Sequence, residues 1–263
     1  MLETKEIKEF AFSIAKEAGE IMRANFCLGM KKEWKKDNSL LTETDLTINQ
    51  LVIDQVAKCF PTYSVIAEEG CQLVTDSQYT WVCDPLDGTT AFAHGIPNCV
   101  FSLALVHQGT PQFGVVYDPF IDRLFWAQKG EGAFCNENPI SVSDATTFEH
   151  QLIGLELPAR LPYRFPGLRT ALLQKKRVRV LTLGSAVYEG MLVGCGELIA
   201  SILTGVKPDV AALKIIVEEA GGKMTDIFGN EQRYDQDIQG SVISNGRVHD
   251  ELIGLIQESL VRV

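Results

Sequence analysis

The hydrophobic positions of the first sixty residues recur at steps of three and four, which predicts two amphipathic helices. The first helix is expected over residues 4–26, and the second follows Thr42-Glu43-Thr44-Asp45 and stops at Phe60-Pro61. The basic run 31–38 lies between them and is interpreted as a solvated loop. A loop at the mouth of a site is the alternative, with Lys36 as its candidate residue.

Short apolar runs take over from residue 64 and predict strands. Two of them, 64–67 and 79–83, each end directly before acidic residues. Four more are expected to form an antiparallel meander, because only short turns separate them. These four runs cover residues 100–107, 113–117, 124–128 and 133–135.

From about residue 141 the pattern changes to strands that alternate with helices. This change divides the chain into an N-terminal α+β half, 1–140, and a C-terminal α/β half, 141–263. The expected strands are 152–157, 177–181, 198–203, 223–226 and 241–244, and the expected helices are 168–175, 184–193, 209–220 and a last one from residue 246. The whole pattern favours an α/β protein.

Composition narrows the function classes. The chain has 263 residues, of which 46% are hydrophobic, and its formal net charge of -10 argues against a nucleic-acid-binding surface. No apolar run approaches the ~20 residues of a membrane span, and the start Met-Leu-Glu-Thr-Lys-Glu is not a signal peptide. Seven cysteines without Cys-x-x-Cys spacing predict reduced thiols. We therefore expect a cytoplasmic protein that binds neither nucleic acid nor membranes.

The stretch Asp84-Pro85-Leu86-Asp87-Gly88-Thr89-Thr90 carries the candidate chemistry. Its two carboxylates emerge where a strand is expected to end, and carboxylate oxygens suit hard cations such as Mg²⁺. The Gly-Thr-Thr segment can open a helix with free backbone N–H groups, which bind phosphate. Together they suggest metal-assisted phosphate chemistry. The alternative is a simple turn with a helix-capping threonine.

Other carboxylates are expected near this stretch. Glu68 and Glu69 follow the strand 64–67, so they are expected at the same edge of the sheet as Asp84 and Asp87. Asp45 begins the second predicted helix, where a charge that favours the helix dipole is the simpler interpretation. His94 is interpreted as structural, because no second His or Cys lies near it in the sequence.

Several motifs, in order and nearly end to end, resemble those of the inositol monophosphatase family of metal-dependent phosphatases. The matching segments are Thr42-Glu43-Thr44-Asp45, Ala67-Glu68-Glu69, residues 81–90, 92–97, 116–119 and 130–134, Gly184-Ser185-Ala186, and Asp209 with residues 211–222. The resemblance implies a layered α-β-α-β-α fold of the sugar-phosphatase type with mixed and antiparallel sheets. It also implies a site at the junction of the two halves, and a homodimer.

The resemblance assigns a role to each matching residue. Two to three Mg²⁺ ions are implied, and a water activated by a metal attacks the phosphorus in line. The implied metal ligands are Glu68, Asp84, the carbonyl of Leu86, Asp87 and Asp209. The implied catalytic residues are Asp45, Thr89 and Glu69, with the Thr89 hydroxyl bonded to Asp45. The implied phosphate- and substrate-binding residues are Gly88, Thr89, Thr90, Ser185 and Ala186.

Departures from the family pattern weaken the case for myo-inositol itself. Pro208-Asp209 stands where Trp-Asp is usual, so the register there is uncertain by one residue. The acidic residue that contacts sugar hydroxyls in inositol-specific members falls in the apolar segment Ser201-Ile202-Leu203. Ala91 and Leu40 replace an Asn and a Pro. Lys207 is a candidate contact for a second anionic group, with a solvated lysine as the simpler interpretation.

The expected function is a Mg²⁺-dependent phosphomonoesterase that hydrolyses a small sugar or polyol phosphate such as inositol monophosphate. Alternative substrates within the same fold are fructose 1,6-bisphosphate, histidinol phosphate, 3′-phosphoadenosine phosphate and NADP. A non-catalytic regulatory protein and a Mg²⁺- or Ca²⁺-binding structural module are the alternatives from other classes. The retained acidic set argues against a degenerate site.

Overall fold

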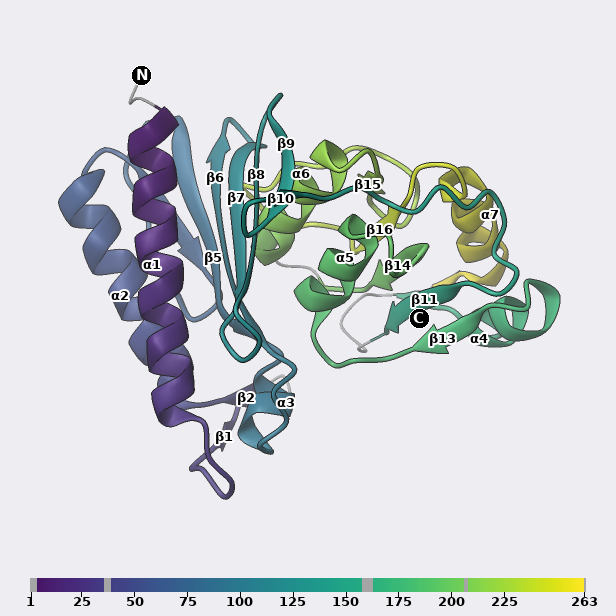
Figure 1. Ribbon diagram of the computed structural model, residues 1–263, viewed down its shortest axis with the longest axis horizontal. Helices are drawn as coiled ribbons and strands as arrows, with labels where there is room; N and C mark the ends of the chain where they lie inside the picture. The colour runs from purple at the N-terminus through teal and green to yellow at the C-terminus, as the bar shows by residue number, and fades with distance from the viewer. Residues whose placement is uncertain (1–3, 36–38, 158–162, 206–207, 263) are drawn as a thin grey trace.

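Helices and sheets alternate in five layers in the computed structural model, which describes residues 4–35, 39–157, 163–205 and 208–262 (Figure 1). Helices α1 (Thr4–Asn25) and α2 (Glu43–Cys59) cover the outer face of an eight-stranded sheet. Helices α5 (Ala186–Gly194) and α6 (Ala211–Glu219) lie between this sheet and a five-stranded one. Helices α4 (Leu168–Thr170) and α7 (His249–Ser259) pack on the far side. The predicted layered α/β fold is confirmed.

The first sheet contains the predicted antiparallel meander and one parallel pair. Its strands, in spatial order, are β10 (Asn138–Pro139), β9 (Gly132–Cys135), β8 (Arg123–Gln128), β7 (Thr110–Asp118), β6 (Val100–His107), β5 (Tyr79–Asp87), β3 (Ser64–Ala67) and β4 (Gly70–Gln72). From β5 to β10 every neighbouring pair is antiparallel. Strand β3 runs parallel to β5, so both end at the same edge of the sheet.

The second sheet is mixed. Its strands, in spatial order, are β13 (Arg179–Leu181), β11 (Leu152–Glu156), β14 (Ala200–Leu203), β16 (Ser241–Ser244) and β15 (Lys223–Thr225). Strand β11 pairs in parallel with both of its neighbours, whereas β16 is antiparallel to both of its own. Apolar side chains of α5 and α6 join those of the first sheet in one core, so residues from both predicted halves share it. The division near residue 140 stays a prediction.

Strand β5 continues to Asp87 and does not end at Cys83 as expected. Its pairing with β6 shifts register between Asp84 and Asp87, which marks a bulge that contains Pro85. A proline is tolerated there because a bulged residue makes no ladder hydrogen bond. The bulge therefore lets one strand carry both acidic residues, and the short helix α3 (Thr89–Ala93) follows at once.

Several small elements were not predicted. The basic run expected to be a loop contains β1 (Glu33–Trp34), which forms an antiparallel hairpin with β2 (Leu40–Leu41) just beyond the run. The strand pair β12 (Tyr163–Arg164) and β17 (Val261–Arg262) was also missed. The helix expected over 168–175 is α4 followed by one π-helical turn, Ala171–Lys175. Two-residue strands carry no periodicity, so a sequence pattern cannot reveal them. The candidates Lys36 and Lys207 lie outside the described residues.

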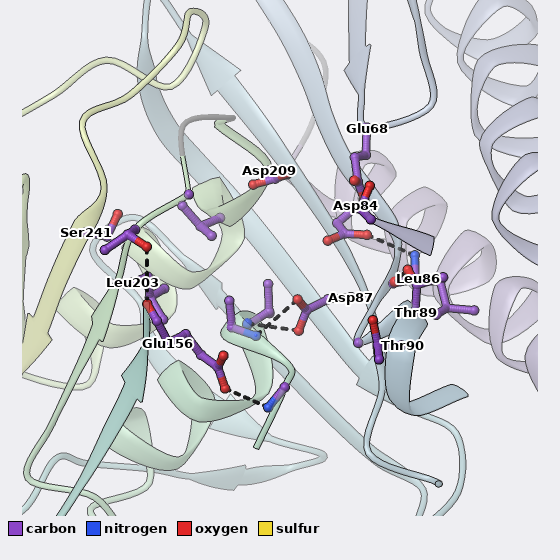
Figure 2. A pocket seen from close by; sticks show the side chains of 18 of the residues that line it. Glu68, Asp84, Leu86, Asp87, Thr89, Thr90, Glu156, Leu203, Asp209 and Ser241 are labelled. Carbon is purple, nitrogen blue, oxygen red and sulfur yellow. Dashed lines mark hydrogen bonds between the residues drawn. The ribbon is translucent and has the colours of Figure 1, made fainter. Parts of the chain in front are cut away.

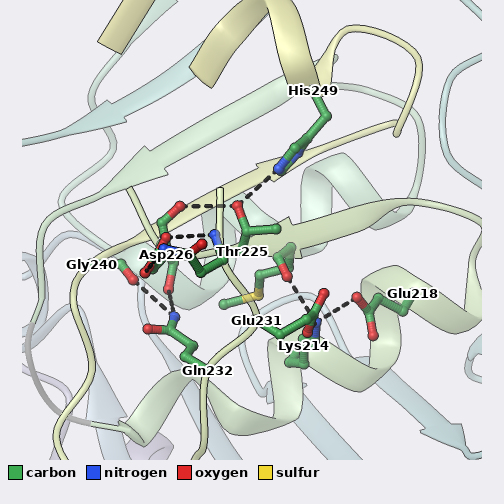
Figure 3. A network of polar contacts seen from close by, with 11 residues as sticks. Lys214, Glu218, Thr225, Asp226, Glu231, Gln232, Gly240 and His249 are labelled. Atoms are coloured by element: carbon green, nitrogen blue, oxygen red, sulfur yellow. Dashed lines mark hydrogen bonds and ion pairs between the residues drawn. The ribbon is translucent and has the colours of Figure 1, made fainter. Parts of the chain in front are cut away.

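A polar network holds the loop that joins β15 to β16 (Figure 3). The buried Lys214 ammonium of α6 donates to Glu218 and Glu231, each at 2.6 Å, and to the Met224 carbonyl at 2.8 Å. Further along the loop, Gln232 Nε2 donates to the Gly240 carbonyl at 2.9 Å. These bonds fix the start of β16, which reaches the cavity described below.

Two further findings concern the environment of the chain. Within the described ranges, no helix has both the length and the apolar character that spanning a membrane requires. All seven cysteines are free, as their spacing predicted.

Candidate metal centre

Three carboxylates from distant parts of the chain meet beside the end of β5 (Figure 2). Glu68 directly follows β3, Asp84 lies in β5, and Asp209 lies in the 3-10 helix Pro208–Val210 that precedes α6. One carboxylate oxygen from each residue lies within 4.8 Å of the other two. The sequence predicted all three as metal ligands, and the fold brings them together.

The pairing of the strands explains this convergence. In the parallel pair β3–β5, Ala67 lies opposite Cys83, so the next residues, Glu68 and Asp84, lie side by side where the pairing of these two strands ends. The Glu68 amide donates to the Cys83 carbonyl at 3.2 Å and extends the pairing by one residue. The Leu86 amide donates to Asp84 Oδ1 at 3.0 Å and fixes the orientation of that carboxylate.

The cluster is electrostatically unfavourable without a cation. Burial raises the pKa of Asp84 well above its usual range, and the charges of Glu68, Asp87 and Asp209 raise it further. A divalent cation would offset this repulsion. The donors are all carboxylate oxygens, which is the ligand chemistry that Mg²⁺ prefers. The residues present therefore fit a Mg²⁺ site.

Asp87 lies in the same cavity but is held by the start of α5. Its carboxylate accepts hydrogen bonds from the Ser185 hydroxyl, from the Ala186 amide at 3.1 Å and from the Val187 amide at 2.9 Å. Burial raises the pKa of Asp87 to about 6, although these hydrogen bonds favour the charged form. Ser185 and Ala186, predicted to bind substrate, thus contact Asp87, and their direct contact with substrate stays a prediction.

Gly88 connects Asp87 to α3 in a conformation that favours glycine. Its φ is +89°, and a Cβ there would lie 2.5 Å from the Asn98 carbonyl oxygen and 3.1 Å from Ser185 Cβ. Any side chain would therefore push the turn away from the strand that follows α3 and from the start of α5. The glycine keeps β5, α3 and α5 close together around the cavity.

The predicted contact between Thr89 and Asp45 is present. Thr89 Oγ1 lies 3.0 Å from Asp45 Oδ1 and 2.9 Å from the Leu86 carbonyl oxygen, so its proton has two acceptors. Asp45 also completes a capping box with Thr42 at the start of α2. It therefore has the helix-terminal position of the simpler interpretation and also contacts the site. Burial raises the pKa of Asp45.

A lysine that the sequence did not single out lies beside the cluster. Lys35, between β1 and β2, places its ammonium 3.2 Å from Glu68 Oε1 and in a still closer ion pair with Glu69. The interpretation of its loop as solvated is therefore wrong at this residue, because the hairpin folds over the acidic edge. The acidic pair at residues 68–69 indicates that a cation could lie nearby, but the sequence does not show which lysine of the basic run 31–38 would provide it.

A cavity of about 360 Å³ joins these residues (Figure 2). It is lined by the three clustered carboxylates, Asp87, Leu86, Gly88, Thr89, Thr90 and Ala186, and on another wall by Glu156, Leu203, Ile238 and Ser241. Of the apolar segment Ser201-Ile202-Leu203, Leu203 lines the cavity and Ile202 packs in the core of the second sheet, and the register near Pro208 stays a prediction. Glu156, at the end of β11, was not predicted as a site residue.

Comparisons with known proteins agree with this geometry. The model of the inositol monophosphatase family matches residues 3–261. A Thermotoga maritima protein named fructose-1,6-bisphosphatase/inositol-1-monophosphatase is 34% identical over 87% of this chain and 86% of its own length. A solved inositol monophosphatase from the same organism has a TM-score of 0.86, with 31% identity over 97% of this chain and 98% of that one.

A solved IMPase/NADP phosphatase complexed with Mg²⁺ and phosphate has a TM-score of 0.84 and 25% identity, covering 95% of each chain. The family match spans nearly the whole sequence and includes every residue of the acidic cluster. The chain belongs to the inositol monophosphatase family.

Proposed function

We propose that this protein is a Mg²⁺-dependent phosphomonoesterase that acts on a small sugar or polyol phosphate. The observation that carries the proposal is the meeting of Glu68, Asp84 and Asp209 oxygens within 4.8 Å in a cavity that also exposes Thr89. Family membership supports the reaction class, since the relatives named above are phosphatases.

Glu68, Asp84, Asp87, Asp209 and the Leu86 carbonyl would hold the ions. When bound, Mg²⁺ supplies Lewis-acid stabilisation of the phosphate and lowers the pKa of a water molecule. The complex of the IMPase/NADP phosphatase with Mg²⁺ and phosphate supports this choice of metal. The proposal includes two to three ions, and Glu69 would help to hold the third.

The protein itself positions the reacting groups. Asp45 and the Leu86 carbonyl accept the proton of the Thr89 hydroxyl, so the lone pairs of its oxygen face a water molecule that attacks phosphorus. The amides of Gly88 and Thr89 donate to the phosphate, with Thr90 beside them. Ser185 and Ala186 keep Asp87 oriented toward the cavity. Orienting these groups in advance lowers the barrier without any movement during the reaction.

The test is a panel of phosphate esters assayed for phosphate release with Mg²⁺ and after chelation. It contains myo-inositol 1-phosphate, fructose 1,6-bisphosphate, histidinol phosphate, 3′-phosphoadenosine 5′-phosphate and NADP. We expect release from at least one ester, loss of release with chelator, and recovery when Mg²⁺ is added back. Release that is unaffected by chelation contradicts the metal role, and no release from any ester favours a non-catalytic protein.

The proposal also includes an oligomeric state and a cellular location. A homodimer and a cytoplasmic location are expected from the family resemblance and from the composition. Light scattering of the purified protein measures the first, and fractionation of cells measures the second. A monomer at working concentration or a membrane-bound fraction contradicts the corresponding part.

A further inference from the structure

A second pair of carboxylates lies on the wall of the cavity away from the metal cluster. Glu156, at the end of β11, accepts the Gly184 amide at 2.6 Å. Glu189, in α5, accepts the adjacent Leu183 amide at 2.8 Å and the Ser201 hydroxyl at 3.0 Å. Successive amides of one loop therefore hold the two side chains next to each other. Figure 2 shows Glu156 on the side opposite Glu68 and Asp84.

The two members of this pair have different surroundings. Glu189 is completely buried, whereas Glu156 is partly exposed and lines the cavity. The pKa of Glu189 is raised to about 8, mainly by burial and in addition by the charge of Glu156 and the hydrogen bond to it. Glu189 is thus protonated at neutral pH, and its carboxyl group can donate a hydrogen bond to the Glu156 carboxylate. The result is a fixed hydrogen-bond acceptor that faces the cavity.

The surroundings of Glu156 are suited to an uncharged or cationic group. The same wall carries Leu203, Ile238 and Ser241, and the Thr204 hydroxyl bonds the Glu156 carbonyl at 3.4 Å. Among the described residues that line the cavity, none is Lys, Arg or His. A phosphate next to Glu156 would meet a like charge with no compensating cation from these residues.

We propose that Glu156 is a specificity-determining residue that accepts a hydrogen bond from a hydroxyl or ammonium group of the leaving alcohol. The proposal rests on the phosphomonoesterase function proposed above. By the same contact, Glu156 disfavours substrates that carry a second phosphate on the leaving group. The site then takes monophosphates of polyols or amino alcohols in preference to bisphosphates.

The experiment compares Glu156→Gln with the wild type on three substrates with Mg²⁺. Myo-inositol 1-phosphate has donor hydroxyls, fructose 1,6-bisphosphate adds a second phosphate, and p-nitrophenyl phosphate has a leaving group without a donor. We expect kcat/KM for the inositol ester to fall about tenfold, mainly through KM, because a neutral amide is the weaker acceptor. The value for p-nitrophenyl phosphate should stay within about twofold, and that for the bisphosphate should rise.

Glu137→Gln is the matched control, since Glu137 is exposed in the turn between β9 and β10. Equal losses on all three substrates would show a general structural effect and overturn the proposal. An unchanged preference for the inositol ester over the bisphosphate would also overturn it. Thermal melting checks that the variant folds, and Glu156→Asp, which keeps the charge on a shorter side chain, should retain more discrimination against the bisphosphate than the amide.

A binding measurement separates this proposal from the phosphatase function. Calorimetry with free myo-inositol, inorganic phosphate and Mg²⁺ should give weaker binding of the polyol to Glu156→Gln than to the wild type. If the wild type hydrolyses none of the esters, the proposed function fails, and the calorimetry alone decides the role of Glu156. Equal polyol binding by both proteins contradicts that role whether or not the protein is a phosphatase.

Discussion

Removing one charge from the acidic cluster should stabilise the metal-free protein and abolish its response to Mg²⁺. The substitution is Asp84→Asn, which keeps the acceptor for the Leu86 amide, now 3.0 Å from Asp84 Oδ1. The cluster places carboxylate oxygens of Glu68 and Asp209 within 4.8 Å of Asp84. The repulsion between two negative charges at this distance is roughly 3–4 kcal/mol at an effective dielectric constant of about 20.

Protonation limits how much of this repulsion the protein bears. Asp84 has a folded pKa above its unfolded value of 3.8, so its contribution to stability is full below about pH 4 and is lost as the pH rises. We expect the asparagine variant to recover about half of the repulsion of one such charge pair, ~2 kcal/mol, which corresponds to a rise in Tm of about 4–8 °C for a chain of this length.

The assay is urea unfolding and thermal melting with chelator and with millimolar Mg²⁺. In chelator the stability advantage of Asp84→Asn should grow as the pH rises above about 4, because the folded pKa of Asp84 is raised above its unfolded value. Mg²⁺ should raise the Tm of the wild type but not that of the variant. Asp54→Asn, at an exposed position of α2, is the control. A variant that is less stable than the wild type in chelator, or that keeps the Mg²⁺ response, refutes the reasoning.

Three other perturbations test separate parts of the account. Thr89→Val should lower kcat about 100-fold with little change in Mg²⁺ affinity. Steady-state kinetics measures the first and calorimetry the second. An equal loss of Mg²⁺ binding would assign Thr89 to the metal site instead. Lys35→Met should tighten Mg²⁺ binding about tenfold, because it removes a cation that competes with Mg²⁺ for the carboxylates of Glu68 and Glu69. The control is Lys31→Met, at an exposed position. If Lys35→Met binds Mg²⁺ more weakly than the control does, competition is excluded. Burial lowers the pKa of His249 from 6.5 to about 4, so up to ~3 kcal/mol of the free energy of unfolding should be lost as the pH falls from 6.5 to 4. In urea unfolding, the stability of His249→Gln should depend less on pH over this range than that of the wild type. The same pH dependence in both proteins would contradict this prediction.

The sequence predicted most of the fold because the elements that form the layers are long and periodic. The first two helices bury one face, so their hydrophobic spacing is informative, and the meander strands are buried on both faces, so they appear as short continuous apolar runs. It placed the end of β5 too early, at Cys83, because a proline within an apolar run is a usual stop signal. The bulge that accommodates Pro85 depends on pairing with β6, which is distant in sequence.

The candidate site was predictable where a motif and a strand end coincide. Glu68 and Asp84 follow strands that were both expected, so their proximity depended only on the strands being parallel neighbours. Lys35 and Glu156 could not be identified in this way. Lys35 reaches Glu69 through a hairpin of two-residue strands, and Glu156 faces the cavity only because β11 pairs with β14 in a particular register. Both depend on tertiary packing, which local patterns do not encode.

Anomalous diffraction from crystals grown with Mn²⁺ in place of Mg²⁺ tests the central claim most directly. We predict an anomalous peak at coordination distance from the carboxylates of Glu68, Asp84 and Asp209, the three residues whose oxygens lie within 4.8 Å of one another. A map with no peak among these three side chains, at a Mn²⁺ concentration that supports phosphate release, would contradict it.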